Sequence, residues 1–61
     1  MYRKLKGLLI VHGMTQQDLA TILNLAASTL NFKINGKTDF TLKEAKIISN
    51  YFKVSIEEIF E

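Results

Sequence analysis

The side chains that could carry out covalent or metal chemistry are few in this chain. The sequence contains one histidine, His12, and no cysteine. Zinc sites take about three or four protein ligands, so we expect neither a disulfide nor a metal site. Nucleophilic catalysis needs a base within hydrogen-bond reach of the nucleophile, and no second base is evident near His12. The sequence therefore predicts no enzyme activity, no metal and no cofactor.

The remaining catalytic candidates have simpler interpretations. Glu57 and Glu58 form the only notable carboxylate pair, and they follow Ser55 where acidic residues favour the start of a helix. His12 is interpreted as a histidine at the carboxyl end of a helix. Three glycines are too few for a phosphate-cradling loop.

Residues that could bind an anion through hydrogen bonds and positive charge are more numerous than the catalytic candidates. Seven Lys or Arg and three acidic residues occur up to Lys46, whereas Lys53 is followed by Glu57, Glu58 and Glu61. The net charge is +2. The basic part suits an anionic partner such as DNA, and an ordinary solvated surface is an equal alternative.

The chain is expected to form a single domain, residues 1–61, without a membrane span. Its longest apolar run, Leu8 to Val11, is far shorter than the roughly 20 residues that a span requires. No secretory signal follows the basic start, so we expect a cytoplasmic protein. The apolar content of 48% is sufficient for a compact core.

Capping signals divide the chain into five predicted helices and no strand, which makes the fold class all-α. The expected ranges are about 2–12, 15–23, 26–34, 41–51 and 55–60. Thr15 is a good N-cap, and full capping boxes are predicted at Thr41-Leu42-Lys43-Glu44 and Ser55-Ile56-Glu57-Glu58. Gly13, Asn24 and Asn35-Gly36 are expected to end helices. Four residues of the fourth helix are expected to face inward, namely Leu42, Ala45, Ile48 and Phe52.

Two short helices joined by a tight turn, at 15–23 and 26–34, describe a helix-turn-helix. In such a unit the second helix fits the major groove of B-DNA. The amino-terminal amides of the first helix can hold a phosphate. We therefore expect duplex DNA to be the partner, with the segment of about 26–34 as the recognition helix.

The segment from Gly13 to Gly36, GMTQQDLATILNLAASTLNFKING, resembles the lambda-repressor-like helix-turn-helix family, also called the Cro or xenobiotic-response-element type. The matching features are Gly13, Thr15-Gln16 ahead of Leu19-Ala20, Thr29-Leu30 and Asn35-Gly36-Lys37. VSIEEIF at 54–60 is similar to the family's last helix, and DFTLKEA at 39–45 is similar to a subgroup common in phage-derived regulators. The resemblance covers almost the whole chain and implies a compact five-helix domain with its helix-turn-helix at helices 2 and 3.

The resemblance also implies the DNA-binding residues. Thr15 and Gln16 match positions that hold the DNA backbone, and Gln16 is also within range of a base. Positions that point into the major groove are Ala27, Ser28 and Phe32. Positions near phosphates are Thr29, Asn31, Asn35 and Lys37, and Lys33 on the same side of the helix is expected to reach a phosphate or a base.

The chain departs from the family at two base-reading positions. Ala27 and Phe32 are apolar, so they can contact a thymine methyl but cannot form the bidentate bonds that discriminate bases. Phosphate contacts and DNA shape would then carry more of the binding. Alternatively Phe32 is buried, or it faces a protein partner.

These features leave two functions open. The first is a sequence-specific transcriptional regulator of the phage-repressor type that binds its operator as a dimer. The second is a protein-interaction module that retains the fold with weakened DNA reading. Ile10 or Val11 is a candidate for a dimer or partner contact, and scattered exposed aliphatics are an equal alternative. Gly7 either marks a close approach to a neighbour or is simply tolerated.

Overall fold

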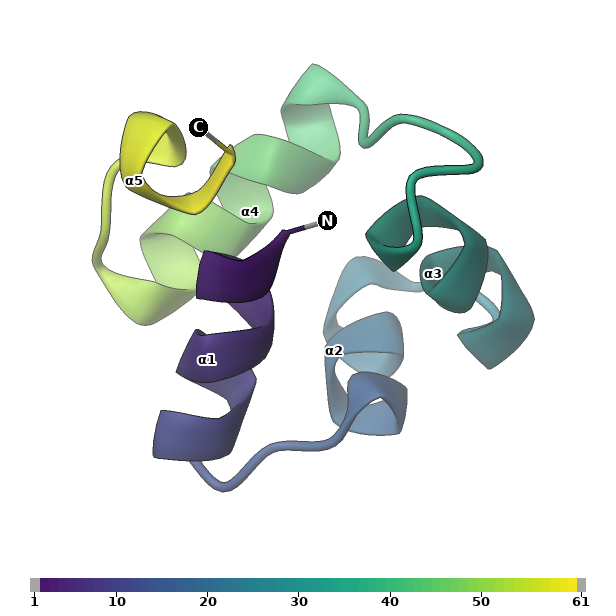
Figure 1. Cartoon of the computed structure of the whole chain (residues 1–61), viewed down its shortest axis with the longest axis horizontal. Coiled ribbons are helices and arrows are strands. Elements are labelled where there is room, and N and C mark those ends of the chain that lie inside the picture. The colour runs from purple at the N-terminus through teal and green to yellow at the C-terminus, as the bar shows by residue number, and fades with distance from the viewer. Residues whose placement is uncertain (1, 61) are drawn as a thin grey trace.

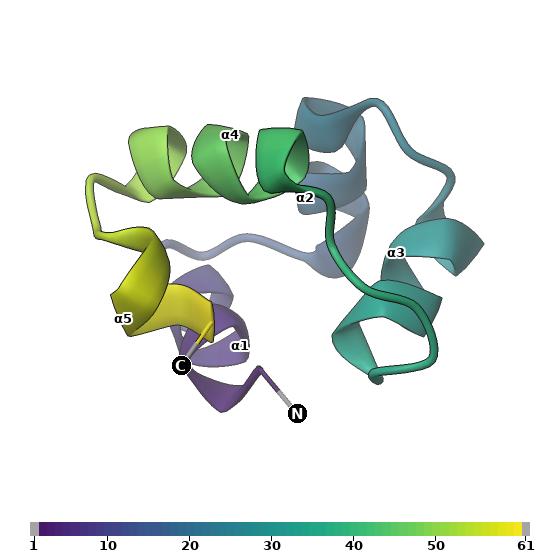
Figure 2. The same cartoon turned by 90° about the horizontal axis from the view of Figure 1, so that it is seen from above.

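A computed structural model of the chain describes residues 2–60, so the two terminal positions of the predicted 1–61 domain, with the acidic Glu61, lie outside the described residues. The described chain forms five helices and no strand. Their bounds are α1 (Arg3–Val11), α2 (Gln16–Leu23), α3 (Ala27–Ile34), α4 (Leu42–Phe52) and α5 (Ile56–Phe60). The predicted all-α class and helix order are therefore confirmed. Figure 1 places α3 at one end of the long axis and α5 at the other, and Figure 2 agrees from a second direction.

Side-chain caps fix where α2 and α4 begin. The Thr15 hydroxyl accepts the amide of Asp18 at 3.1 Å, and the Thr15 amide donates to the Asp18 carboxylate at 2.9 Å. Thr41 and Glu44 form the same pair of bonds at 3.1 and 2.9 Å, as predicted. Ser55 accepts the amide of Glu58 at 3.2 Å, which is one half of the capping box predicted there.

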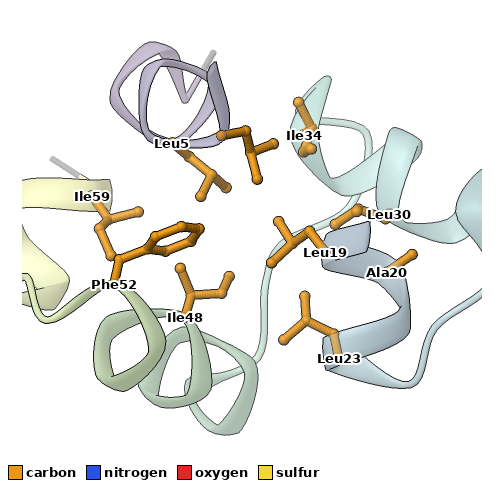
Figure 3. Packing of buried hydrophobic residues seen from close by; sticks show 10 residues of the cluster. Leu5, Leu19, Ala20, Leu23, Leu30, Ile34, Ile48, Phe52 and Ile59 are labelled. Carbon is orange, nitrogen blue, oxygen red and sulfur yellow. The ribbon is translucent and has the colours of Figure 1, made fainter. Parts of the chain in front are cut away.

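The core lies where all five helices meet. The largest fully buried side chains are Leu5, Leu19, Leu30, Ile34, Ile48 and Ile59. Figure 3 shows these side chains converging with Phe52 from different helices. No described helix has the length and apolarity that crossing a membrane requires.

Leu42 is the one predicted inward residue of α4 that the structure exposes, at 66%. It lies on the same side of α4 as Ala45 but lines an open groove with Phe40. Helical periodicity fixes the face of a residue, but it does not determine how far the neighbouring elements extend along that face. The predicted burial of Leu42 is therefore wrong.

An aromatic cluster joins the start of α1, the segment before α4 and the end of α5. The ring of Tyr2 lies 5.2 Å from that of Phe40 and 5.5 Å from that of Phe60, both edge to face. Phe40 and Phe60 lie 5.3 Å apart. Such pairs stabilise beyond the area that they bury, so both ends of the described chain are held in place.

Candidate nucleic-acid interface

The turn between α2 and α3 sets the angle at which α3 leaves the core. Asn24 adopts the left-handed conformation with φ 58°, as predicted for a residue at this turn. The amide of Asn24 donates to Thr21 at 3.1 Å, and the amide of Leu25 donates to Ala20 at 2.8 Å. These bonds satisfy the last carbonyls of α2 and let α3 begin after a very short connection.

The outer face of α3 is a continuous exposed strip. Leu30 and Ile34 anchor the helix in the core. The residues at helical spacing on the opposite side are exposed, namely Ala27, Ser28, Asn31, Phe32 and Asn35. Thr29 is half-buried between the two faces. The structure thus brings the predicted groove-facing positions together on one surface that no other part of the described chain covers.

A chain of amide groups links this strip to the start of α2. The Asn31 amide donates to the side-chain oxygen of Gln16 over a long 3.4 Å contact. The Asn35 amide donates to the Asn31 side-chain oxygen at 3.1 Å. Gln16, which is half-buried, therefore lies beside α3 and not apart from it. The arrangement orients three polar side chains before any ligand arrives.

Lys33 does not lie on the exposed strip, and the prediction that it shares the DNA-facing side is wrong. Its side chain is buried, with 9% of the residue exposed. Its ammonium group donates to the carbonyl of Asp39 at 3.0 Å and lies 3.0 Å from the carboxylate of Glu44. It also lies 5.9 Å from the centre of the Phe40 ring. These internal partners hold the charge of Lys33 on the side of α3 that faces α4.

Glu44 supplies the negative charge that pairs with the buried ammonium group of Lys33. Burial raises the pKa of its carboxyl group, but the amide of Thr41 and the ammonium of Lys33 donate to the carboxylate, and the pKa lies below its ordinary value of 4.5. The carboxylate is therefore ionised at neutral pH. One acidic side chain both caps α4 and neutralises Lys33.

Lys37 lies just beyond α3 and remains exposed. Gly36 has a positive φ of 81°, and the amide of Lys37 donates back to the carbonyl of Phe32 at 2.9 Å. The Lys37 ammonium lies 5.2 Å from the centre of the Phe32 ring. Phe32 is 48% exposed, which excludes the fully buried alternative for this side chain.

Sequence reasoning missed one basic residue beside this surface. Lys6 of α1 lines a groove of about 250 Å³ together with Ile10, Met14 and Gln16. The sequence does indicate that Lys6 and Ile10 share a face of α1, because they are four residues apart. The structure places that face of α1 next to the start of α2. Lys6 therefore extends the exposed strip of α3 beyond Gln16.

Side chains that could hold a metal ion are not grouped together in the described part of the chain. No cluster of three His, Asp or Glu side chains there has the geometry of a metal site. The ring of His12 lies 5.0 Å from that of Phe52, against the carboxyl end of α4. His12 itself is exposed, with Phe52 on one side of its ring.

Comparisons with known proteins agree with this geometry. A family model described as helix-turn-helix matches residues 2–59. The chain is 42% identical over 60 residues to a protein of Methanocaldococcus jannaschii named "uncharacterized HTH-type transcriptional regulator". The aligned region covers 98% of this chain and 91% of that relative. No solved structure gives a significant match.

Proposed function

The chain belongs to the lambda-repressor-like helix-turn-helix family of DNA-binding regulators, and from this premise we propose that residues 1–61 act as one domain that inserts α3 into the major groove of duplex DNA. The observation that carries the proposal is the continuous exposed strip on α3, joined by hydrogen bonds to Gln16 and extended by Lys37. A protruding helix of this kind fits the major groove.

Phosphate contacts come from both ends of the strip. At one end, Thr15 and Gln16 hold one DNA strand, with Lys6 as the nearby cation. At the other end, Thr29, Asn31 and Asn35 contact phosphate oxygens with Lys37. Lys33 takes no part, since its ammonium group is engaged with Asp39 and Glu44. Lys6 and Lys37 therefore supply the positive charge that faces DNA at this surface.

Base reading falls to Ala27, Ser28 and Phe32. Ser28 can bond to several bases, whereas Ala27 and Phe32 offer apolar contact with a thymine methyl. The Gln16 side chain accepts a hydrogen bond from Asn31 and also contacts the DNA. Direct readout is therefore narrow, and much of the specificity comes from DNA shape.

The regulator acts as a repressor of the phage type and binds a two-fold symmetric operator as a dimer. Two domains on one face of DNA place their recognition helices about 34 Å apart, in successive major grooves. Since this domain reads few base pairs, the second copy supplies both affinity and specificity through the repeated half-site.

A protein-interaction module is the second candidate, favoured by the exposed apolar side chains Ile10, Val11 and Phe32. Salt separates the two functions. Binding through several phosphates weakens steeply as salt rises, whereas an apolar protein interface does not weaken in this way.

The experiment that tests the proposal is selection from a random duplex pool at low and physiological salt, followed by sequencing of the retained DNA. We expect a short palindromic motif at physiological salt. A Phe32→Ala variant selected in parallel should retain a different motif, because the change alters a base-reading position and leaves the phosphate contacts in place. Retention only at low salt and without a motif would contradict the regulator and favour the interaction module.

A further inference from the structure

Asn35 and Gly36 form a chemically reactive pair at the end of the exposed strip of α3. The backbone nitrogen that follows an asparagine can lose its proton and attack the side-chain carbonyl carbon, and ammonia leaves. Water then opens the resulting five-membered imide to aspartate or isoaspartate. A side chain on the attacking residue obstructs this reaction, and glycine has none. The other asparagines are also exposed but precede leucine, phenylalanine or tyrosine, namely Asn24, Asn31 and Asn50.

The folded chain holds Asn35 in a conformation that prevents ring closure. A five-membered ring requires the Gly36 nitrogen to eclipse Cβ of Asn35 across the Cα–C bond. Asn35 has a φ of −83° and a ψ of 3°, so that nitrogen eclipses the backbone nitrogen of Asn35 instead. The Gly36 amide also donates to the carbonyl of Lys33 at 3.1 Å. Rotation about ψ breaks this bond, so the reaction requires the last turn of α3 to open.

The side chain of Asn35 is held as well. Its amide nitrogen donates to the side-chain oxygen of Asn31 at 3.1 Å, which directs the side-chain carbonyl carbon along the helix. The next amide, that of Lys37, donates to the carbonyl of Phe32 at 2.9 Å. These bonds must break or shift together with the bond from Gly36 before the ring can form.

Lys33 sets how readily this turn opens. Its ammonium group donates to the carbonyl of Asp39 at 3.0 Å and lies 3.0 Å from the carboxylate of Glu44. The turn is therefore held between α3 and a segment that Lys33 ties down. Helix ends open at a lower free energy than the core does, and the rate of reaction at Asn35 should follow the fraction of time that this turn is open.

Both products change the exposed strip in the same direction. A carboxylate replaces the amide of Asn35, so it can no longer donate to the Asn31 oxygen, and two acceptors face each other. The new negative charge lies where the proposed contact places DNA phosphates, which repel it. In isoaspartate the main chain also runs through the side-chain carbons, and the longer backbone displaces the hydrogen bonds of the turn.

We propose that Asn35–Gly36 is a site of spontaneous deamidation, opened to reaction by fraying of the last turn of α3 and protected by bound DNA, so that the DNA-binding surface is lost as the chain ages. The loss of binding rests on the proposed function. The reaction itself requires only water and the free chain.

Peptide mapping by mass spectrometry tests the reaction on the full chain, incubated at fixed pH and temperature with and without guanidinium chloride. In denaturant, Asn35 should convert faster than the other asparagines. In the native chain Asn35 should still convert first, at least about tenfold more slowly than in denaturant, because the turn must open. Conversion of Asn35 at the rate of the others in denaturant, or a native chain that stays intact at Asn35, would overturn the site. Equal native and denatured rates would overturn its control by the turn.

Lys33→Met tests that control without altering the Asn35–Gly36 pair. Its native rate should rise at least about threefold, while the rate in denaturant stays that of the wild type. Lys46→Met, at an exposed position of α4, is the matched control and should change neither rate. Should Lys33→Met fail to fold, Asn31→Ala serves the same purpose, because it removes the acceptor of the Asn35 side chain. A native rate that the folded variant leaves unchanged contradicts the proposal.

DNA separates this inference from the proposed function. The operator duplex at about ten times its Kd should slow conversion about tenfold, because it binds only the closed turn. Asn35→Asp, which reproduces one product, should weaken binding at least about tenfold. Asn35→Gln keeps the amide but requires a larger ring, so it should remain unconverted and retain most of the affinity.

The two failures have different signatures. A chain that converts at Asn35 as expected but binds no DNA would overturn the regulator and leave the reaction standing. A chain that binds its operator equally well before and after conversion would leave the regulator standing and overturn the loss of binding with age.

Discussion

The ammonium nitrogen of Lys33 lies 3.0 Å from the carboxylate of Glu44, and this contact joins α3 to the capping box of α4. Glu44 also accepts the amide of Thr41 at 2.9 Å, and Lys33 also donates to Asp39. The segment between α3 and α4 is thereby fixed from both sides. A lysine of α3 that looks suited to DNA is instead bound to the segment before α4 and to the capping box of that helix.

Lys33→Met should lower the free energy of unfolding by about 1–3 kcal/mol, because it leaves the Glu44 carboxylate without its cation. Urea denaturation measures the change, and Lys46→Met, at an exposed position of α4, should stay within about 0.5 kcal/mol of the wild type. The salt dependence of DNA binding should not change. A flatter salt slope with unaltered stability would instead place Lys33 at a phosphate.

The lowered pKa of Glu44 predicts a specific acid sensitivity. The folded-state pKa lies below the ordinary value of 4.5, so the stabilisation is complete above pH 4.5 and is lost as the pH falls through the lowered value. The stability difference between the wild type and Glu44→Gln should therefore be largest at neutral pH and shrink in acid. Unfolding curves at about pH 7 and at about pH 3 test this, and a difference that stays constant would contradict it.

The bond between Gln16 and Asn31 should appear as energetic coupling in DNA binding. Gln16→Ala and Asn31→Ala should each weaken binding, and the double variant should lose less than the two changes combined, by about 0.5–1.5 kcal/mol. Both positions are partly or fully exposed, so each single change should alter stability by less than about 1 kcal/mol. Strict additivity of the binding effects would mean that the two side chains act independently on DNA.

Lys37 and Lys6 should each account for part of the salt dependence. Replacing either by alanine should weaken binding to all duplexes alike and reduce the slope of log K against log salt by about 0.9 for each phosphate that is no longer neutralised. Lys53, at the end of α4 remote from α3, provides the matched control as Lys53→Gln. If Lys37→Ala behaves like this control, the phosphate contacts are misplaced.

Phe32 should sense the methyl group of thymine. On the selected operator, replacing thymine by uracil at the contacted position should weaken wild-type binding about fourfold, from the burial of one methyl at about 0.8 kcal/mol. Phe32→Ala should bind both duplexes with similar affinity. Equal sensitivity of both proteins to the methyl would assign its contact to another side chain, with Ala27 as the neighbouring candidate.

Much of the fold can be predicted because its determinants are local. Thr15 and Thr41 indicate helix starts by capping, and Asn24 tolerates the left-handed turn that the helix-turn-helix needs. The left-handed conformation of Lys53 could not be predicted, since lysine has no preference for it. Features fixed within four or five residues are therefore accessible from the sequence.

Features fixed by contact between helices are less accessible. Lys33 follows Leu30 by three residues and so shares its buried face, but the carboxylate and carbonyl that receive it come from the segment before and within α4. The placement of Lys6 beside Gln16 likewise depends on how α1 meets α2. Helical spacing predicts the exposed strip of α3, and the role of that strip in binding DNA stays a prediction.

The aromatic cluster of Tyr2, Phe40 and Phe60 has a consequence for the order of folding. Contacts within and between neighbouring helices close short loops, whereas the contact between Tyr2 and Phe60 closes a loop of nearly the whole chain. Closing long loops costs more entropy, so these rings should come together late, after the helix-turn-helix has formed. The transition state for folding should then be insensitive to Phe60→Leu, which would act mainly by speeding unfolding.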